Sequence, residues 1–240
     1  MVETLTKIAT DLVRRPIKTP KALKSDEARA EAFASLKSEV DRQNGVQTSD
    51  PDWALVEKLS TDYLCRVQKD LRAASYLARA WSEQHGASGA LAGAKLLEQL
   101  LVTGAEKVAP SRVRGRQQAL QWWSRQTLIN NCDGLRNPEN TEQQEEFLAC
   151  LDRMSATIEN EPKLAGKKEL FLDVREELNT DPADLAAYEG LPAEAATAKD
   201  AASSIPDKSE PEPPPPVMTY TDDSGADTPA DASPSDADVQ

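Results

Sequence analysis

The sequence contains very few of the side chains on which most enzymes and metal sites depend. It has one histidine, His85, and three cysteines in 240 residues. A structural zinc site is built from Cys and His ligands, and His85 has no second histidine and no cysteine near it in the sequence. No Ser-His-Asp or Cys-His arrangement can be built around this single imidazole. We therefore expect no catalytic residue, no cofactor and no metal ion, and hence a protein that is not an enzyme.

Long apolar runs are also missing. A membrane-spanning helix needs about 20 consecutive apolar residues, and no stretch approaches that length. The opening segment MVETLTKIATDLVRRPIK places Lys7 and Asp11 inside its apolar stretch, so it does not resemble a signal peptide. Cys65, Cys132 and Cys150 are widely spaced and form no CxxC pattern, which is typical of buried free thiols in a reducing compartment. We expect a soluble, cytoplasmic protein without a membrane span.

The sequence has no strong excess of positive charge, which argues against nucleic acid as a partner. The formal net charge is −13, and residues 179–240 account for −12 of it with 14 Asp/Glu against two Lys. Residues 1–178 are nearly neutral, with 26 Lys/Arg and 27 Asp/Glu. The late segment also holds ten of the 16 prolines, including PEPPPP at 211–216. Because it has too little apolar surface to offset the entropy lost on ordering, we predict a disordered acidic tail.

Patterns typical of β-strands are lacking as well. No run of Val, Ile and Thr alternates with polar residues, and no repeat of fixed period appears. Helical spacing of apolar residues is present instead. The longest such pattern begins at Pro51, with Asp50 as its N-cap, and runs for about 33 residues to a stop at Gly86 and Gly89, either as one helix or broken once near Ser60. The sequence predicts an all-α bundle of about six helices. We divide it into an N-terminal amphipathic segment (1–24), a helical domain (25–178) and the acidic tail (179–240).

The segment GASGALAGAK has some likeness to a phosphate-binding loop. Such a loop requires Gly-Lys-Ser/Thr between a strand and a helix, so that backbone amides and the lysine converge on phosphate. Here Lys95 follows Ala94, no hydroxyl residue comes next, and the preceding element is helical. Gly89, Gly93 and Ala94 fall on one helix face. We predict that these small residues let a neighbouring helix approach closely.

The adjacent pair Trp122 and Trp123 lies in a helical pattern, where neighbouring side chains point about 100° apart. Trp123 shares a face with Val113 and Leu120 and is predicted to lie in the core. Trp122 points elsewhere. It either packs against another helix or forms an exposed anchor for a protein partner.

An aspartate interrupts the apolar pattern of QKDLRAASYLARAW at 68–81. On a continuous helix Asp70 borders the buried stripe, while Lys69 points toward solvent and Arg72 lies at the flank. A buried carboxylate is costly without a partner. Arg116 lies in the apolar stripe of a later helix. We therefore hypothesise that Asp70 forms an ion pair with Arg116 between two helices.

These segments together resemble a known family. FASLKSEVDR (33–42), DPDWALVEKLSTDYL (50–64), KDLRAASYLARAW (69–81), GASGALAGAKLLEQLL (86–101) and RQQALQWW (116–123) are similar to the ImpA-related N-terminal domain of TssA-type proteins of the bacterial type VI secretion system. The chain departs from the family pattern at GAEKVAP and in having an acidic tail where TssA-type proteins continue into ring-forming regions. The residues of the resembling motif are Trp53, Lys69, Asp70, Leu71, Arg72, Trp81, Arg116, Leu120 and Trp123.

The resemblance implies a function in assembly rather than catalysis. It implies an accessory or adaptor component that docks on baseplate, sheath or tail-tube proteins of the secretion system. We name Arg112, Arg114 and Trp122 as a possible protein-binding surface. The alternative is a stand-alone helical regulator, or a chaperone-like binder of an effector.

Overall fold

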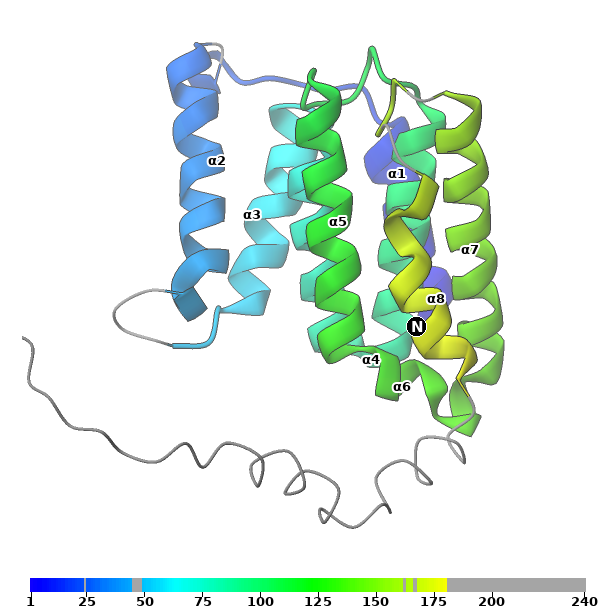
Figure 1. The fold of residues 1–240 in the computed structure, drawn as a ribbon. Helices are drawn as coiled ribbons and strands as arrows, with labels where there is room; N and C mark the ends of the chain where they lie inside the picture. Colours follow the sequence, from blue (N-terminus) through cyan, green and yellow to red (C-terminus); the bar gives the residue numbers. More distant parts are fainter. Residues whose placement is uncertain (24, 45–48, 162, 166–167, 181–240) are drawn as a thin grey trace, which may run out of the picture. The chain divides into compact units, whose positions relative to one another are not determined.

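The computed structural model describes residues 1–23, 25–44, 49–161, 163–165 and 168–180, so nearly all of the predicted acidic tail lies outside the described residues. The described part is built from helices, as predicted, and contains no strand. It has eight α-helices where the sequence predicts about six (Figure 1). They are α1 (Val2–Arg14), α2 (Asp26–Val40), α3 (Trp53–Arg66), α4 (Leu71–Val102), α5 (Val113–Asn130), α6 (Cys132–Arg136), α7 (Thr141–Asn160) and α8 (Leu172–Asn179), with short 3₁₀ turns at Lys21–Leu23, Asp41–Asn44, Pro138–Asn140 and Lys168–Phe171.

Helix α4 is the centre of the bundle and is folded back on itself. Gly86 has φ 55° and ψ −136°, a backbone conformation open to glycine and strained for other residues. It divides α4 into a first arm (71–85) and a second arm (87–102). The prediction that a helix stops at Gly86 is therefore confirmed, whereas Gly89 lies inside the second arm. Helices α1, α3, α5 and α7 all pack against α4.

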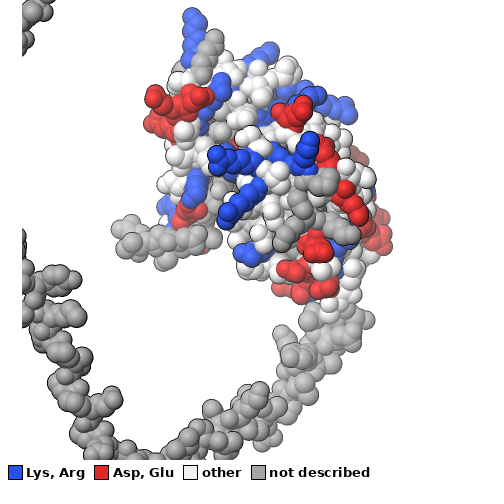
Figure 2. Space-filling view, turned by 45° about the horizontal axis from the view of Figure 1, so that its top comes forward, with Lys and Arg blue, Asp and Glu red and all other residues white. Residues whose placement is uncertain are grey.

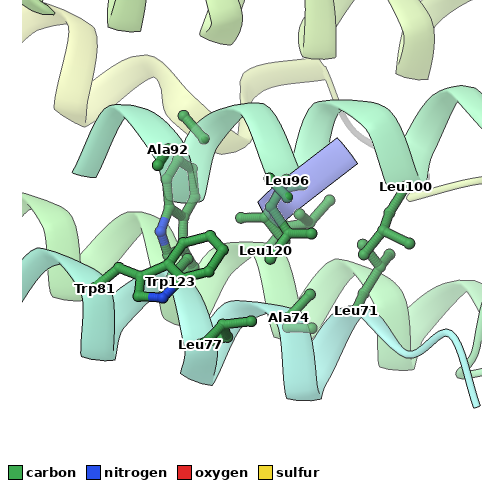
Figure 3. Close-up of a cluster of buried hydrophobic side chains, with 14 of the residues drawn as sticks. Leu71, Ala74, Leu77, Trp81, Ala92, Leu96, Leu100, Leu120 and Trp123 are labelled. Atoms are coloured by element: carbon green, nitrogen blue, oxygen red, sulfur yellow. The ribbon is translucent and has the colours of Figure 1, made fainter. Parts of the chain in front are cut away.

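The two arms of α4 pack directly on each other through small residues. A Cβ atom added to Gly93 would lie 2.6 Å from the Cβ of Ala78, and one added to Gly89 would lie 1.9 Å from the carbonyl oxygen of Trp81. The prediction that small residues permit a close helix approach is confirmed. Figure 3 shows side chains of the first arm facing those of the second, with Leu120 and Trp123 of α5 beside them. Each large apolar side chain buried in this way contributes about 1.5–3 kcal/mol of transfer free energy.

The predicted 33-residue pattern is broken, as one of its two alternatives had it, but at another place. It is two helices, α3 and α4, and the break falls at residues 67–70 rather than near Ser60. Helix α3 begins with Asp52, whose side chain accepts a hydrogen bond from the Leu55 amide at 3.0 Å. The predicted start, Asp50 followed by Pro51, is two residues too early. Apolar residues continue through the break at helical spacing, which is why their pattern alone does not reveal it.

The N-terminal helix α1 packs against α4 and α3. Its buried residues are Leu5, Ala9 and Leu12, whereas Ile8 is 39% exposed. No helix among the described residues combines the length and apolar character that crossing a membrane would require.

Candidate functional site

Asp70 is a helix cap and does not lie in the interior of a helix. Its backbone is extended, with φ −135° and ψ 122°, and its carboxylate accepts a hydrogen bond from the Arg72 amide at 2.8 Å. This is the usual role of an aspartate at the N-cap position, where it satisfies an amide that has no partner within the helix. Asp70 is fully buried. The buried carboxylate therefore has its hydrogen-bond partner in the first turn of α4.

The partner of the buried carboxylate is Arg72 and not Arg116. The Arg72 guanidinium donates to both carboxylate oxygens of Asp70, at 3.1 and 2.6 Å. The same guanidinium lies 4.0 Å from the ring centroid of Phe33 in α2, a cation–π distance. Burial alone lowers the pKa of Arg72, but hydrogen bonding to Asp70 and the charge of Asp70 outweigh it, so this pKa is raised. The cation–π contact of Arg72 with Phe33 therefore links the start of α4 to α2.

Lys69 is also placed differently from the prediction. It is 7% exposed, and its ammonium donates to the carbonyl oxygens of Leu12 at the end of α1 and of Leu64 near the end of α3. A cation is favourable at these positions because carbonyl groups at a helix C-terminus lack partners and carry partial negative charge. Burial lowers the pKa of Lys69. The predicted orientation toward solvent is wrong because the helix ends before this residue.

Arg116 of α5 is buried, as predicted from its place in the apolar stripe, but it binds backbone carbonyls. It donates to Leu164 at 2.6 Å, Pro110 at 2.5 Å and Ser111 at 2.8 Å, and also to Lys163. The hypothesis of an Asp70–Arg116 ion pair is therefore wrong. The five N–H groups of a guanidinium can satisfy several carbonyls at once. Arg116 thus fixes the loop before α5 and the segment after α7.

The remaining motif residues lie in the core or are partly buried. Leu71, Leu120, Trp81 and Trp123 are buried in the core. Trp53 is partly buried beneath the guanidinium of Arg79, which lies 5.3 Å from its ring centroid.

The predicted surface residues Arg112, Arg114 and Trp122 line one groove. It lies between the first arm of α4 and the start of α5, and its volume is about 480 Å³. The loop that precedes α5 forms a further wall of this groove. This loop is tied to the start of α4, because Leu71 donates to the Ala109 carbonyl and Ala109 donates to the Lys69 carbonyl, both at 2.8 Å. We call this site the arginine groove, and its lining residues are Arg72, Ser75, Tyr76, Pro110, Ser111, Arg112, Arg114, Gly115, Gln118, Ala119 and Trp122.

An aromatic pair forms the apolar part of the arginine groove. The rings of Tyr76 and Trp122 meet edge to face with centroids 4.9 Å apart. Both residues are partly buried. Trp122 therefore packs against another helix, which was the first of its two predicted alternatives, while it also lines the groove. Burial, followed by the nearby Asp41 carboxylate, raises the pKa of Tyr76, so its ring carries no charge at neutral pH.

The groove has a positive rim. Arg112 and Arg114 are exposed, and within the described ranges neither forms an ion pair. No Asp or Glu is found among the lining residues, although Asp70 lies beneath Arg72 and neutralises it. Lys107 and Lys163 are exposed close by on the other side of Ser111. Figure 2 shows Lys and Arg side chains gathered at the centre of this view, with Asp and Glu toward its edges.

The described residues offer no group of three or more His, Cys, Asp or Glu side chains that could hold a metal ion. The three cysteines are free thiols, as predicted. Burial raises the pKa of Cys132 to about 11 and that of Cys150 to about 12. Cys65 is only partly buried.

Sequence reasoning missed the contribution of the first arm of α4 to the groove. Tyr76 and Ser75 lie more than 30 positions before Arg112, and they reach the groove only because α5 packs back on α4. The sequence feature that could have indicated this wall is Tyr76, which lies on the flank of a helical stripe otherwise rich in alanine and leucine. Gln118 was also missed. It lies one helical turn from Arg114 and from Trp122 on the same face.

Comparison with protein families places the groove inside a recognised domain. Residues 15–125 match the family model described as ImpA, N-terminal, type VI secretion system. All of the groove-lining residues fall within this range. Searches of curated proteins and of solved structures return no match.

Proposed function

Because the chain contains an ImpA N-terminal domain and is thereby associated with type VI secretion, we propose that it is a non-enzymatic adaptor that binds another protein in the arginine groove. The adaptor acts in the cytoplasm and docks on a baseplate, sheath or tail-tube protein. The observation that carries this proposal is the groove itself. It joins an aromatic pair to exposed arginines within the matched domain.

The lining chemistry supports a protein ligand over a small molecule. Arginine and tryptophan are the residues that most often dominate binding energy at protein interfaces. Arg112 and Arg114 can each form a charge-assisted bidentate contact with a carboxylate, and Tyr76 and Trp122 offer an apolar surface between them. The complementary partner segment therefore carries acidic and apolar side chains together.

Affinity capture tests this function. The tagged full chain is expressed in cells that carry the secretion apparatus, and captured proteins are identified by mass spectrometry. The variant R112E/R114E reverses the groove charge, and we expect it to reduce recovery of a baseplate, sheath or tail-tube component by about tenfold or more. Negative residues at a helix N-terminus are favourable, so this variant is expected to fold. The control R14E/R125E reverses two exposed arginines that do not line the groove.

The results of this capture experiment distinguish docking through the groove from docking elsewhere and from the regulator or chaperone-like alternative. Recovery of such a component by the wild type and the control, with its loss from R112E/R114E, supports docking through the groove. Equal recovery by all three chains places the docking surface elsewhere. Recovery of a toxin effector alone supports the regulator or chaperone-like alternative.

A further inference from the structure

We propose that the docking surface continues from the arginine groove into a second, basic hollow, and that the partner segment is acidic and reaches both. This hollow has a volume of about 400 Å³. We call it the lysine hollow, and its lining includes Gln68, Lys107, Ser111, Val113 and Lys163. The proposal rests on the arginine groove being the docking site. It adds the extent of that site, the chemistry of the bound segment, and a specificity-determining residue, Lys163.

The two hollows lie on two sides of the first turn of α5. Ser111 lines both of them. Val113 lines the lysine hollow and Arg114 lines the arginine groove, because successive side chains on a helix point about 100° apart. Val113 is 36% exposed, so the lysine hollow has an apolar surface beside its lysines. A partner segment that enters both hollows therefore passes over Ser111.

Lys163 is held at this surface from a part of the chain outside the matched domain. The family match covers residues 15–125, whereas Lys163 follows α7. Buried Arg116 of α5 donates to the Lys163 carbonyl and to the Leu164 carbonyl, the latter at 2.6 Å. Leu164 is fully buried, while Lys163 is exposed. In Figure 1 the start of α5 and the end of α7 accordingly lie at the same end of the bundle. The segment after α7 thus adds an anchored cation to a surface supplied by the matched domain.

The charge of this surface determines the chemistry of the segment that fits it. Four exposed cations line the two hollows, namely Arg112, Arg114, Lys107 and Lys163. Within the described part of the chain, none of the four has an ion-pair partner. Glu106, which is exposed, is the one acidic side chain among the described lining residues. Because unpaired like charges repel one another, a segment with carboxylates at two places is favoured here.

A protein segment fits this surface better than nucleic acid. Residues 1–178 carry 26 Lys/Arg and 27 Asp/Glu, so the helical part of the chain lacks the excess of positive charge that binding to a phosphate backbone uses. The cations are instead local and lie next to apolar side chains, namely Trp122 in the groove and Val113 in the hollow. Carboxylates and apolar side chains together complement such a surface.

Site-specific photo-cross-linking in the full chain tests the proposal. p-Benzoylphenylalanine replaces either Gln68 in the lysine hollow or Gln118 in the arginine groove, both of which are exposed. Each chain is expressed in cells that carry the secretion apparatus, and cross-linked peptides are mapped by mass spectrometry after irradiation. We expect both positions to cross-link to one partner protein, within one segment rich in Asp and Glu. Cross-links from Gln118 alone, cross-links to two different proteins, or a segment without acidic residues would each overturn the proposal.

Charge reversal measures what the two lysines contribute. K107E/K163E is expected to lower recovery of the cross-linked partner about three- to tenfold, because two attractive contacts become repulsive. K163E alone should lower it about twofold or more. Within the described residues neither lysine ammonium donates a hydrogen bond, and Arg116 binds only the backbone of Lys163, so these variants are expected to fold.

The matched control is K7E/K58E, which reverses two exposed lysines that line neither hollow. It should leave recovery of the partner unchanged, and circular dichroism checks that every variant is folded. Recovery that is the same for wild type and K107E/K163E would overturn the proposal.

Failure here is distinguishable from failure of the proposed function. If recovery depends on Arg112 and Arg114 but not on Lys107 and Lys163, docking in the arginine groove stands and the extended surface is overturned. If recovery depends on neither pair, the groove is not the docking site and both proposals are overturned. Loss of recovery after nuclease treatment would identify nucleic acid as the bound anion and overturn the acidic protein segment.

Discussion

At the scale of single residues, the structure shows how one aspartate can be mistaken for a mid-helix charge. Asp70 is buried and paired, as its place beside the apolar stripe suggests. Its partner is Arg72, only two positions away, because Asp70 caps a new helix and its carboxylate faces the first turn. If one helix is assumed to continue through residues 67–70, its geometry predicts a direction for the Asp70 side chain. The backbone at Asp70 is extended instead, so the side chain points in a different direction.

A double-mutant cycle tests this assignment. We expect D70N and R72Q to show a coupling of about 0.5–1 kcal/mol in the free energy of unfolding, because they share one partly exposed ion pair. The pair D70N and R116Q should show coupling near zero. Chemical denaturation of the four chains in each cycle provides the measurement, and a larger coupling with Arg116 would contradict the assignment.

The cysteines give a prediction about pH. The pKa of Cys132 is raised to about 11 and that of Cys150 to about 12 by burial, from an ordinary value of 9.0. Because the thiolate is the reactive form, only Cys65 should react rapidly with a thiol reagent at pH 8 in the native protein. The stability contributed by the two neutral thiols is present below about pH 9 and is lost as the pH rises toward their folded pKa values. Kinetics with 5,5′-dithiobis(2-nitrobenzoate) check this: rapid reaction of all three thiols before unfolding would refute it.

At the scale of elements, the most informative feature is the hairpin formed by the two arms of α4. The sequence supports its existence, because the small residues at Gly89, Gly93 and Ala94 share one face and Gly86 interrupts the pattern. The identity of the facing helix is not encoded in that local pattern. Only the fold shows that the second arm packs back on Ala78 and Trp81 of the first.

Glycine substitutions test the hairpin. G93A should destabilise the fold by about 1–3 kcal/mol, because its new methyl group would lie 2.6 Å from the Cβ of Ala78. G89A should cost more, since its Cβ would meet the rigid backbone of Trp81 at 1.9 Å. G134A in α6 is the control, because nothing lies within 4 Å of its Cβ. It should be neutral or stabilising by up to about 1 kcal/mol. Thermal unfolding measures all three, and a G93A protein as stable as G134A would show that the arms are not in close contact.

At the scale of the whole molecule, the sequence predicts the fold class and part of the groove. The helical periodicity and the resemblance are enough for an all-α domain with Arg112, Arg114 and Trp122 on its surface. They do not predict the wall made by Ser75 and Tyr76, because that wall depends on how α5 docks on α4. Long-range packing of this kind leaves no local pattern in one sequence.

The arginine groove is the proposed docking site for the partner. Hydrogen–deuterium exchange of the full chain, with and without a captured secretion component, tests it most directly. We predict slower exchange on binding for residues 72–76 and 110–122, with little change in α7 and α8. Protection confined to α7 and α8, with the groove segments unchanged, would contradict the claim.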